Sequence, residues 1–329
     1  MADADIPVTV RKYGSPAPLT RMVGWSMLAC LAAFLINNVL NVGYDYAGVL
    51  DLLNGQGGGV ALAIYAVGIV GAILMVLATK DVTLRWDAML IHKFNLYLIR
   101  VCFWSVLFVG ITDSAIAVMR VEKVLPYFFN EDVVRSLGLS RYVGSYVHLP
   151  IIGASFVIAF FTRTLGFTWL TLMIVMSELL IVISRFVFSY EQALMGDLVR
   201  YWYAALFLFA SAFTLFEEGH VRVDVLYAGF KDKTRGFVNA VGSLFLGAST
   251  AWVILYIGFN GKQSIINAPL MNFEMTQTGG VGMFVKYQMA GFLGMFAITM
   301  LIQFVSYFFE AVADYRSEPG KREIAPVAH

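Results

Sequence analysis

The sequence predicts an all-α polytopic membrane protein with about eight transmembrane helices and both termini in the cytoplasm. Of its 329 residues, 59% are hydrophobic and only 14% are charged, whereas soluble domains carry about 25% charged residues. Apolar runs of about 20 residues recur along the chain, and each is long enough as a helix to cross the ~30 Å hydrocarbon core. Helices are expected because an open sheet in lipid would leave backbone groups unpaired, and the ~10-residue alternation of a barrel is absent.

Eight hydrophobic segments follow one another along the chain. They span residues 22–42, 60–78, 94–119, 147–161, 167–188, 198–215, 237–258 and 284–308. The fourth and fifth segments are the least distinct, since only Arg163–Gly166 interrupts what could otherwise be one long helix. In the loop at 120–146, aromatic and aliphatic residues alternate with charges, which predicts a helix lying in the membrane interface.

The distribution of basic residues decides between eight spans and seven. With eight spans and a cytoplasmic N-terminus, the cytoplasmic segments hold fourteen Lys and Arg residues and the outer loops hold five. This asymmetry is what the positive-inside rule requires. Treating 147–188 as one helix would move every later loop to the other side and remove the asymmetry, so the charges favour eight spans.

Several charged side chains fall inside the predicted spans. Glu178 lies in the middle of the fifth span, and Arg185 follows seven residues later on the same helical face. Asp113 lies inside the third span, with Arg100 near the other end of that span. A charge at this depth costs about 2.5–3.5 kcal/mol on insertion scales, so each is expected to have a polar partner. Glu178 and Arg185 are therefore candidates for helix packing or for contact with another subunit.

Composition gives no sign of a metal site or a disulfide framework. Cys30 and Cys102 both lie within apolar runs, and His92, His148, His220 and His329 lack the spacing of metal ligands. We therefore expect no metal and no cofactor. The net charge of +1 gives no reason to expect a nucleic-acid partner. The expected environment is the lipid bilayer.

The densest polar stretch is EEGHVRVDVLYAGFKDKTRG, residues 217–236, between the sixth and seventh spans. Gly219 is suited to end the sixth helix in a left-handed conformation, and Asp224 is suited to cap a short helix that follows. His220, Arg222 and Asp224 alternate with valines, so in an extended segment the three polar side chains share one face. The stretch is therefore predicted to form a polar connection on the cytoplasmic face.

This pattern resembles the small, DctQ-like membrane subunit of tripartite ATP-independent periplasmic (TRAP) transporters. The resemblance rests on GHVRVDVLY followed by the basic turn KDKTR, and on SRFVFSYEQAL at 184–194, where the fifth span ends and Glu191 precedes the sixth. It covers residues 167 to about 313. One departure is Tyr190, where the family usually has tryptophan.

The resemblance divides the chain into three parts. Residues 166–313 form the DctQ-like four-helix domain, and residues 314–329 form a cytoplasmic tail. Residues 1–165 add about four spans that the typical small subunit lacks, and no role for them follows from the family.

The resemblance implies a scaffold subunit of a secondary transporter in the bacterial inner membrane, and not an enzyme. Such a subunit braces a large TRAP membrane subunit, which performs sodium-coupled uptake of a substrate that a periplasmic substrate-binding protein delivers, commonly a carboxylate. The family motif and the charges near the fifth span give the candidates for subunit contact, namely Gly219, His220, Arg222, Asp224, Arg185, Glu191 and Glu178. For Glu191, capping of the sixth span is the favoured interpretation, and contact of this exposed anion with the binding protein is the alternative.

Two alternatives stay open at this point. The first is a self-sufficient membrane carrier or channel, in which the four additional spans supply a path. The second is a haem-binding membrane redox anchor, although His92 and His148 fall at opposite edges of the predicted membrane region.

Overall fold

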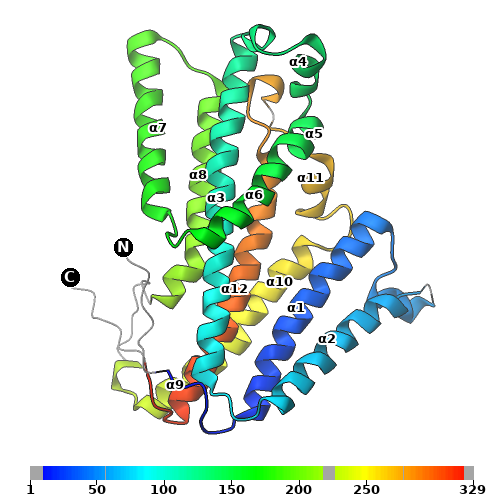
Figure 1. Cartoon of the computed structure of the whole chain (residues 1–329), viewed down its shortest axis with the longest axis vertical. Coiled ribbons are helices and arrows are strands. Elements are labelled where there is room, and N and C mark those ends of the chain that lie inside the picture. The colour runs from blue at the N-terminus through cyan, green and yellow to red at the C-terminus, as the bar shows by residue number, and fades with distance from the viewer. Residues whose placement is uncertain (1–9, 56, 218–226, 277, 322–329) are drawn as a thin grey trace. The chain divides into compact units, whose positions relative to one another are not determined.

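The computed structural model describes residues 10–55, 57–217, 227–276 and 278–321 (Figure 1). The regular secondary structure in this part of the chain is helical, apart from an isolated β-bridge between Tyr13 and Val82. Eight helices within it are long and apolar enough to span a membrane, as predicted. They are α1 (Pro18–Tyr44), α2 (Gly59–Ala78), α3 (Leu84–Val121), the continuous Ser140–Phe161, α7 (Phe167–Phe188), α8 (Ala193–Phe216), the continuous Asp232–Gly258 and α12 (Lys286–Tyr315).

Two of the spanning helices contain an internal π-helical turn. Ser140–Phe161 consists of α5 (Ser140–Val143), the π turn η3 (Gly144–His148) and α6 (Leu149–Phe161). Asp232–Gly258 consists of α9 (Asp232–Val241), the π turn η5 (Gly242–Ala248) and α10 (Ser249–Gly258). A π turn changes the direction in which the following side chains point, and such turns often occur at functional positions.

Short helices occupy the connections. They are η1 (Val49–Asn54), η2 (Leu125–Tyr127), α4 (Glu131–Leu137), η4 (Tyr227–Gly229), α11 (Asn267–Asn272) and η6 (Gly279–Val281). The helix predicted in the loop at 120–146 is present as α4, which is two turns long. Asn130 caps it by accepting a hydrogen bond from the backbone N–H of Val133 at 3.1 Å.

The fourth and fifth spans are separate helices, as the loop charges indicated. α6 ends at Phe161 and α7 begins after Gly166, which has φ +75°. A side chain there would also meet the ring of Phe103, since an added Cβ would lie 2.1 Å from it. Glycine is therefore needed to end the connection and start α7. The side of the membrane on which the termini lie stays a prediction.

The chain forms two compact units. The first unit comprises Leu96–Ser211 and Gln263–Phe296, and the second unit comprises Ala2–Asn95, Ala212–Lys262 and Ala297–His329. α3, α8 and α12 each contribute residues to both. Both units therefore combine residues of the N-terminal region, 1–165, with residues of the DctQ-like region that begins at position 166.

The core of the first unit forms where α3 packs on α8. Trp202 of α8 is buried, and its indole Nε1 donates to the backbone carbonyl of Val106 in α3 at 3.2 Å. Gly110 makes this approach possible, because a Cβ at that position would lie 2.3 Å from the same nitrogen. The rings of Tyr201 and Phe209 of α8 pack against the ring of Phe292 of α12, with centroids 5.2 and 4.9 Å apart, the first pair tilted and the second edge-on.

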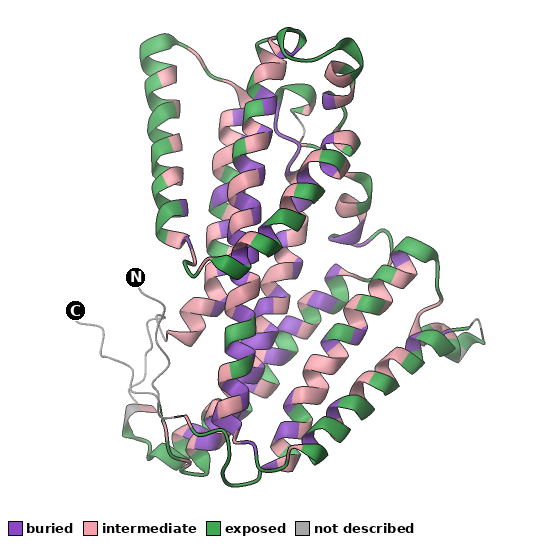
Figure 2. Ribbon diagram, in the orientation of Figure 1, coloured by how far each residue is buried: buried purple, intermediate pink, exposed green. Residues whose placement is uncertain are grey.

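The second unit contains α1, α2, α9 and α10 together with the start of α3 and most of α12. Asn37 of α1 donates to the carbonyl of Ala61 in α2 at 3.2 Å. Phe34 of α1 packs edge-on against Trp252 of α10, with ring centroids 5.7 Å apart. Figure 2 shows that buried residues gather on α3 and α12, whereas α2 and α7 are mostly exposed.

Candidate functional site

The family motif lies outside the described residues. Gly219, His220, Arg222 and Asp224 all fall within 218–226, so their predicted roles stay predictions. The structure describes the basic turn that follows them. There, Arg235 Nε donates to the carbonyl of Tyr227 at 3.3 Å, and its guanidinium lies 5.5 Å from the centre of the Tyr227 ring. This contact joins η4 to the first turns of α9.

Arg185 and Glu191 form an ion pair at the turn between α7 and α8. Arg185 Nε lies 3.4 Å from Glu191 Oε2, and both side chains are more than half exposed. Exposed pairs of this kind contribute at most about 1 kcal/mol. The partner of Arg185 is thus the carboxylate beyond the helix end, and capping of α8 by Glu191 stays a prediction.

Glu178 lies halfway along α7 and is exposed. Within the described part of the chain, no hydrogen bond or ion pair reaches its carboxylate. Arg100 of α3 is a second intramembrane charge whose Nε is buried without a hydrogen-bond partner there. For these two groups the described residues supply no partner, so the expectation that each has one stays a prediction.

The expectation is confirmed for Asp113, which belongs to a fully buried polar chain in the first unit. Asp113 Oδ1 lies 3.3 Å from His148 Nε2, and His148 Nδ1 lies 2.9 Å from the hydroxyl of Tyr287. Gln288 Nε2 donates to the same hydroxyl at 3.0 Å, and the Tyr201 hydroxyl donates to Gln288 Oε1. The chain joins α3, η3, α8 and α12.

A neutral His148 protonated on Nε2 satisfies every group in this chain. Tyr201 then donates to Gln288, Gln288 to Tyr287, Tyr287 to His148 and His148 to Asp113, so that all bonds run in one direction. A second ring proton on Nδ1 would leave the Tyr287 O–H without its acceptor. Because both ring nitrogens are engaged, His148 is not free to act as an axial haem ligand.

Arg120 holds the segment that precedes α12. Its Nε donates to the carbonyl of Gly280 at 2.7 Å, and its Nη2 donates to the carbonyl of Gly282 at 2.6 Å. The guanidinium also lies 4.0 Å from the centre of the Phe284 ring. Arg120 belongs to α3, so a helix from the additional N-terminal region fixes this segment of the DctQ-like region.

Two carboxylates accept hydrogen bonds from backbone N–H groups of the same segment. Asp113 Oδ2 accepts from the N–H of Phe284 at 2.7 Å, and Asp197 Oδ2 accepts from the N–H of Met283 at 3.0 Å. The hydroxyl of Thr276 lies 3.4 Å from the same Asp197 oxygen. Charge-assisted bonds to backbone N–H groups are stronger than neutral ones, so the segment is firmly held.

The second unit has its own buried ion pair, between the start of α1 and the start of α3. Arg21 Nε lies 2.7 Å from Asp87 Oδ2, and both side chains are almost completely buried. Trp25 Nε1 donates to the same carboxylate oxygen at 2.8 Å, and Arg21 Nη2 donates to the hydroxyl of Thr79 at 3.1 Å. The pair therefore joins α1, α3 and the end of α2.

A second buried arginine joins α3 to the end of α12. Arg85 Nη1 lies 2.7 Å from Glu310 Oε2, and Arg85 Nη2 lies 2.8 Å from Asp314 Oδ1. Farther along, Asn95 Nδ2 donates to the carbonyl of Thr299 at 3.0 Å. The polar side chains at the start of α3 are thus used to hold α12.

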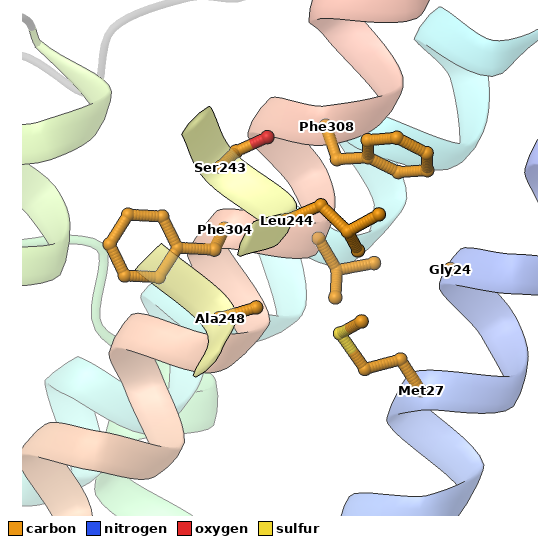
Figure 3. Close-up of a pocket in the computed structure, with 8 residues that line it drawn as sticks. Gly24, Met27, Ser243, Leu244, Ala248, Phe304 and Phe308 are labelled. Atoms are coloured by element: carbon orange, nitrogen blue, oxygen red, sulfur yellow. The ribbon is translucent and has the colours of Figure 1, made fainter. Parts of the chain in front are cut away.

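Figure 3 shows a small crevice in the second unit, between α1, η5 and α12. Its lining is apolar apart from the hydroxyl of Ser243, which donates to the carbonyl of Ala240 at 3.0 Å. Met27, Leu244 and Phe308 are among the side chains that line it. With no charged lining residue, the crevice does not resemble a site for a carboxylate or a cation.

The described residues contain no group of three or more His, Cys, Asp or Glu side chains that could hold a metal ion. The buried carboxylates Asp87, Asp113 and Asp197 bind side chains or backbone of the same chain. Sequence reasoning identified Asp113 as a group that needs a partner, but it missed His148, Tyr287 and Asp197. No local signal marks these, since His148 and Tyr287 are 139 positions apart.

These features define a multi-pass helical membrane protein whose buried polar groups join helices rather than line a cavity. The family model for tripartite ATP-independent periplasmic transporters, DctQ component, matches residues 172–311. Those residues belong to that family, within a few positions of the region the motifs indicated, and four additional spanning helices precede them. The matched family is a non-enzymatic transport family. No curated protein and no solved structure matches it.

Proposed function

We propose that this chain is the small scaffold subunit of a TRAP-type secondary transporter. In this proposal it braces a large membrane subunit, which couples sodium entry to uptake of a substrate, expected to be a carboxylate. A soluble binding protein delivers the substrate on the periplasmic side, and the complex lies in the bacterial inner membrane. The four additional N-terminal helices are part of this supporting structure.

The observation that carries the proposal is that charged side chains in the interior bind groups of their own chain. This holds for the buried Asp113, Asp197, Arg21 and Arg85 and for the partly buried Arg120. A coupling-ion site needs unpaired carboxylate or carbonyl oxygens around a cavity, usually beside interrupted helices. Helices joined through satisfied polar groups favour a rigid support instead.

Reconstitution tests the proposal directly. Proteoliposomes are prepared with the large subunit and the binding protein, with or without this chain, and uptake of radiolabelled substrate is measured under a sodium gradient. We expect uptake only when all three components are present. Sodium-driven uptake by this chain alone would overturn the scaffold role and favour a self-sufficient carrier.

The predicted cytoplasmic motif gives a second test. Replacing Arg222 and Asp224 together by alanine is expected to reduce both the yield of the complex and uptake, while the binding protein keeps its affinity for substrate. The matched control replaces Lys80 and Asp81, an exposed cation and anion in the turn before α3. If the motif variant behaves like the control variant, the proposed role of the motif is wrong.

A further inference from the structure

α7 uses one side to pack against its own chain. Leu170 is the fully buried residue of this helix, and Phe167, Met173 and Ile174 pack partly against the core of the first unit. The opposite side is exposed along the whole length of α7, which Figure 2 shows in green. Lipid alone would cover such a surface if it were apolar throughout.

The exposed side of α7 is not apolar throughout. Thr171, Glu178 and Arg185 are spaced seven residues apart and all three are exposed. Seven residues of an α-helix return to nearly the same direction, with a drift of about 20° per repeat. The three side chains therefore form one line along the helix, here called the α7 stripe.

The polar side chains of the α7 stripe make few polar contacts with the described residues of their own chain. The Thr171 hydroxyl donates to the carbonyl of Phe167 one turn earlier, at 2.9 Å. Arg185 has only the exposed ion pair with Glu191. Glu178, at the centre, has no hydrogen bond or ion pair among the described residues.

α2 provides the comparison. It is exposed to a similar extent, but its sequence GVALAIYAVGIVGAILMVLA contains no charged residue. Contact with acyl chains suffices for α2. It does not suffice for α7, because an ionised carboxylate halfway along a spanning helix is costly unless another group pairs with it.

We propose that the α7 stripe is the contact line for a membrane-spanning helix of another chain. That helix presents a hydrogen-bond donor, cationic or amide, at the depth of Glu178. Polar side chains repeated every seven residues fit a partner helix that crosses at a small angle, as in left-handed helix pairs. The inference rests on the proposed function, which makes the large membrane subunit the source of the helix.

Charge argues against a second copy of this chain as the occupant. Two copies share one membrane topology, so a symmetric pair is related by a two-fold axis along the membrane normal. Such an axis places Glu178 opposite Glu178 and Arg185 opposite Arg185. Like charges in direct contact are unfavourable, which leaves a chain of different sequence.

Site-directed photo-crosslinking in cells that express the whole transport system tests the proposal. A benzophenone amino acid replaces Val175 or Val182, which flank Glu178 on the stripe side, and adducts with a tagged large subunit are quantified. The controls replace Met176 or Leu180, on the far side of α7. All four side chains are 49–59% exposed, so exposure does not separate them.

We expect adducts with the large subunit to be about tenfold more abundant at the two stripe positions than at the controls. Glu178→Leu should reduce these adducts, whereas Glu178→Gln should retain them because the amide oxygen still accepts. The inference is overturned by equal labelling at all four positions, by labelling of lipid alone or by adducts between two copies. In each of these cases the proposed function still stands if the large subunit co-purifies. Failure of the large subunit to co-purify overturns both.

Discussion

Asp113→Leu is expected to destabilise the protein strongly. The carboxylate accepts from Phe284 N–H at 2.7 Å and lies 3.3 Å from His148 Nε2, and all three groups are buried. Leucine fills a similar volume but accepts neither bond. Both donors are then left unpaired in the interior, and Arg120 loses a nearby opposite charge.

The magnitude follows from these two donors. An unsatisfied buried donor costs about 1–3 kcal/mol. With two such donors, we expect the free energy of unfolding to fall by about 2–6 kcal/mol. His148→Phe removes the same Asp113–His148 bond but leaves the Tyr287 O–H without its acceptor. The double variant should therefore lose less stability than the sum of the two single losses.

Reversible unfolding by SDS in mixed micelles, followed by circular dichroism, measures these differences. Ser114→Ala is the control, because Ser114 neighbours Asp113 but bonds only to the carbonyl of Ile111 within its own helix. It should change the free energy by less than about 0.5 kcal/mol. Strictly additive effects of the Asp113 and His148 replacements, or an Asp113→Leu variant as stable as the control, would refute the buried chain.

Three further predictions concern other parts of the molecule. Arg21→Met leaves the buried Asp87 carboxylate without its cation and should cost about 3–5 kcal/mol in SDS unfolding, part of which Asp87→Leu restores. Removal of residues 1–165 should prevent accumulation of folded protein, measured by size-exclusion chromatography, although the whole family match at 172–311 is retained. Burial raises the pKa of the Glu318 carboxyl despite the opposing charges of Arg316 and Arg85. Its ionisation therefore costs stability as pH rises through that pKa, and Glu318→Gln should melt higher than the wild type at pH 7 but equally near pH 4.

The spanning helices were predictable because their signal is local. A run of about 20 apolar residues satisfies its own backbone hydrogen bonds and its contact with lipid without reference to the rest of the chain. The break between α6 and α7 was predictable for a related reason. Arg163 places a charge between the two apolar runs, and Gly166, three residues later, allows the left-handed conformation that precedes α7. Residues 172–311 were identified through a motif of fixed order.

The polar pairings were not predictable, because nothing local determines them. Asp113 and His148 lie 35 positions apart, and Arg21 and Asp87 lie 66 apart. Arg21 counted as a cytoplasmic charge in the topology prediction, yet its side chain is almost completely buried against Asp87. The sequence alone does not show whether a charged side chain at a helix end is solvated by water or paired with a carboxylate.

The indole of Trp202 gives the first unit a built-in optical reporter. Its ring is buried and its N–H is bonded to the carbonyl of Val106, so its fluorescence should be emitted at short wavelength as long as α3 and α8 stay together. Separation of these helices would admit water or detergent to the ring and shift the emission to the red. With the other five tryptophans replaced by phenylalanine, one spectrum would follow the integrity of this helix pair during assembly, without any attached dye.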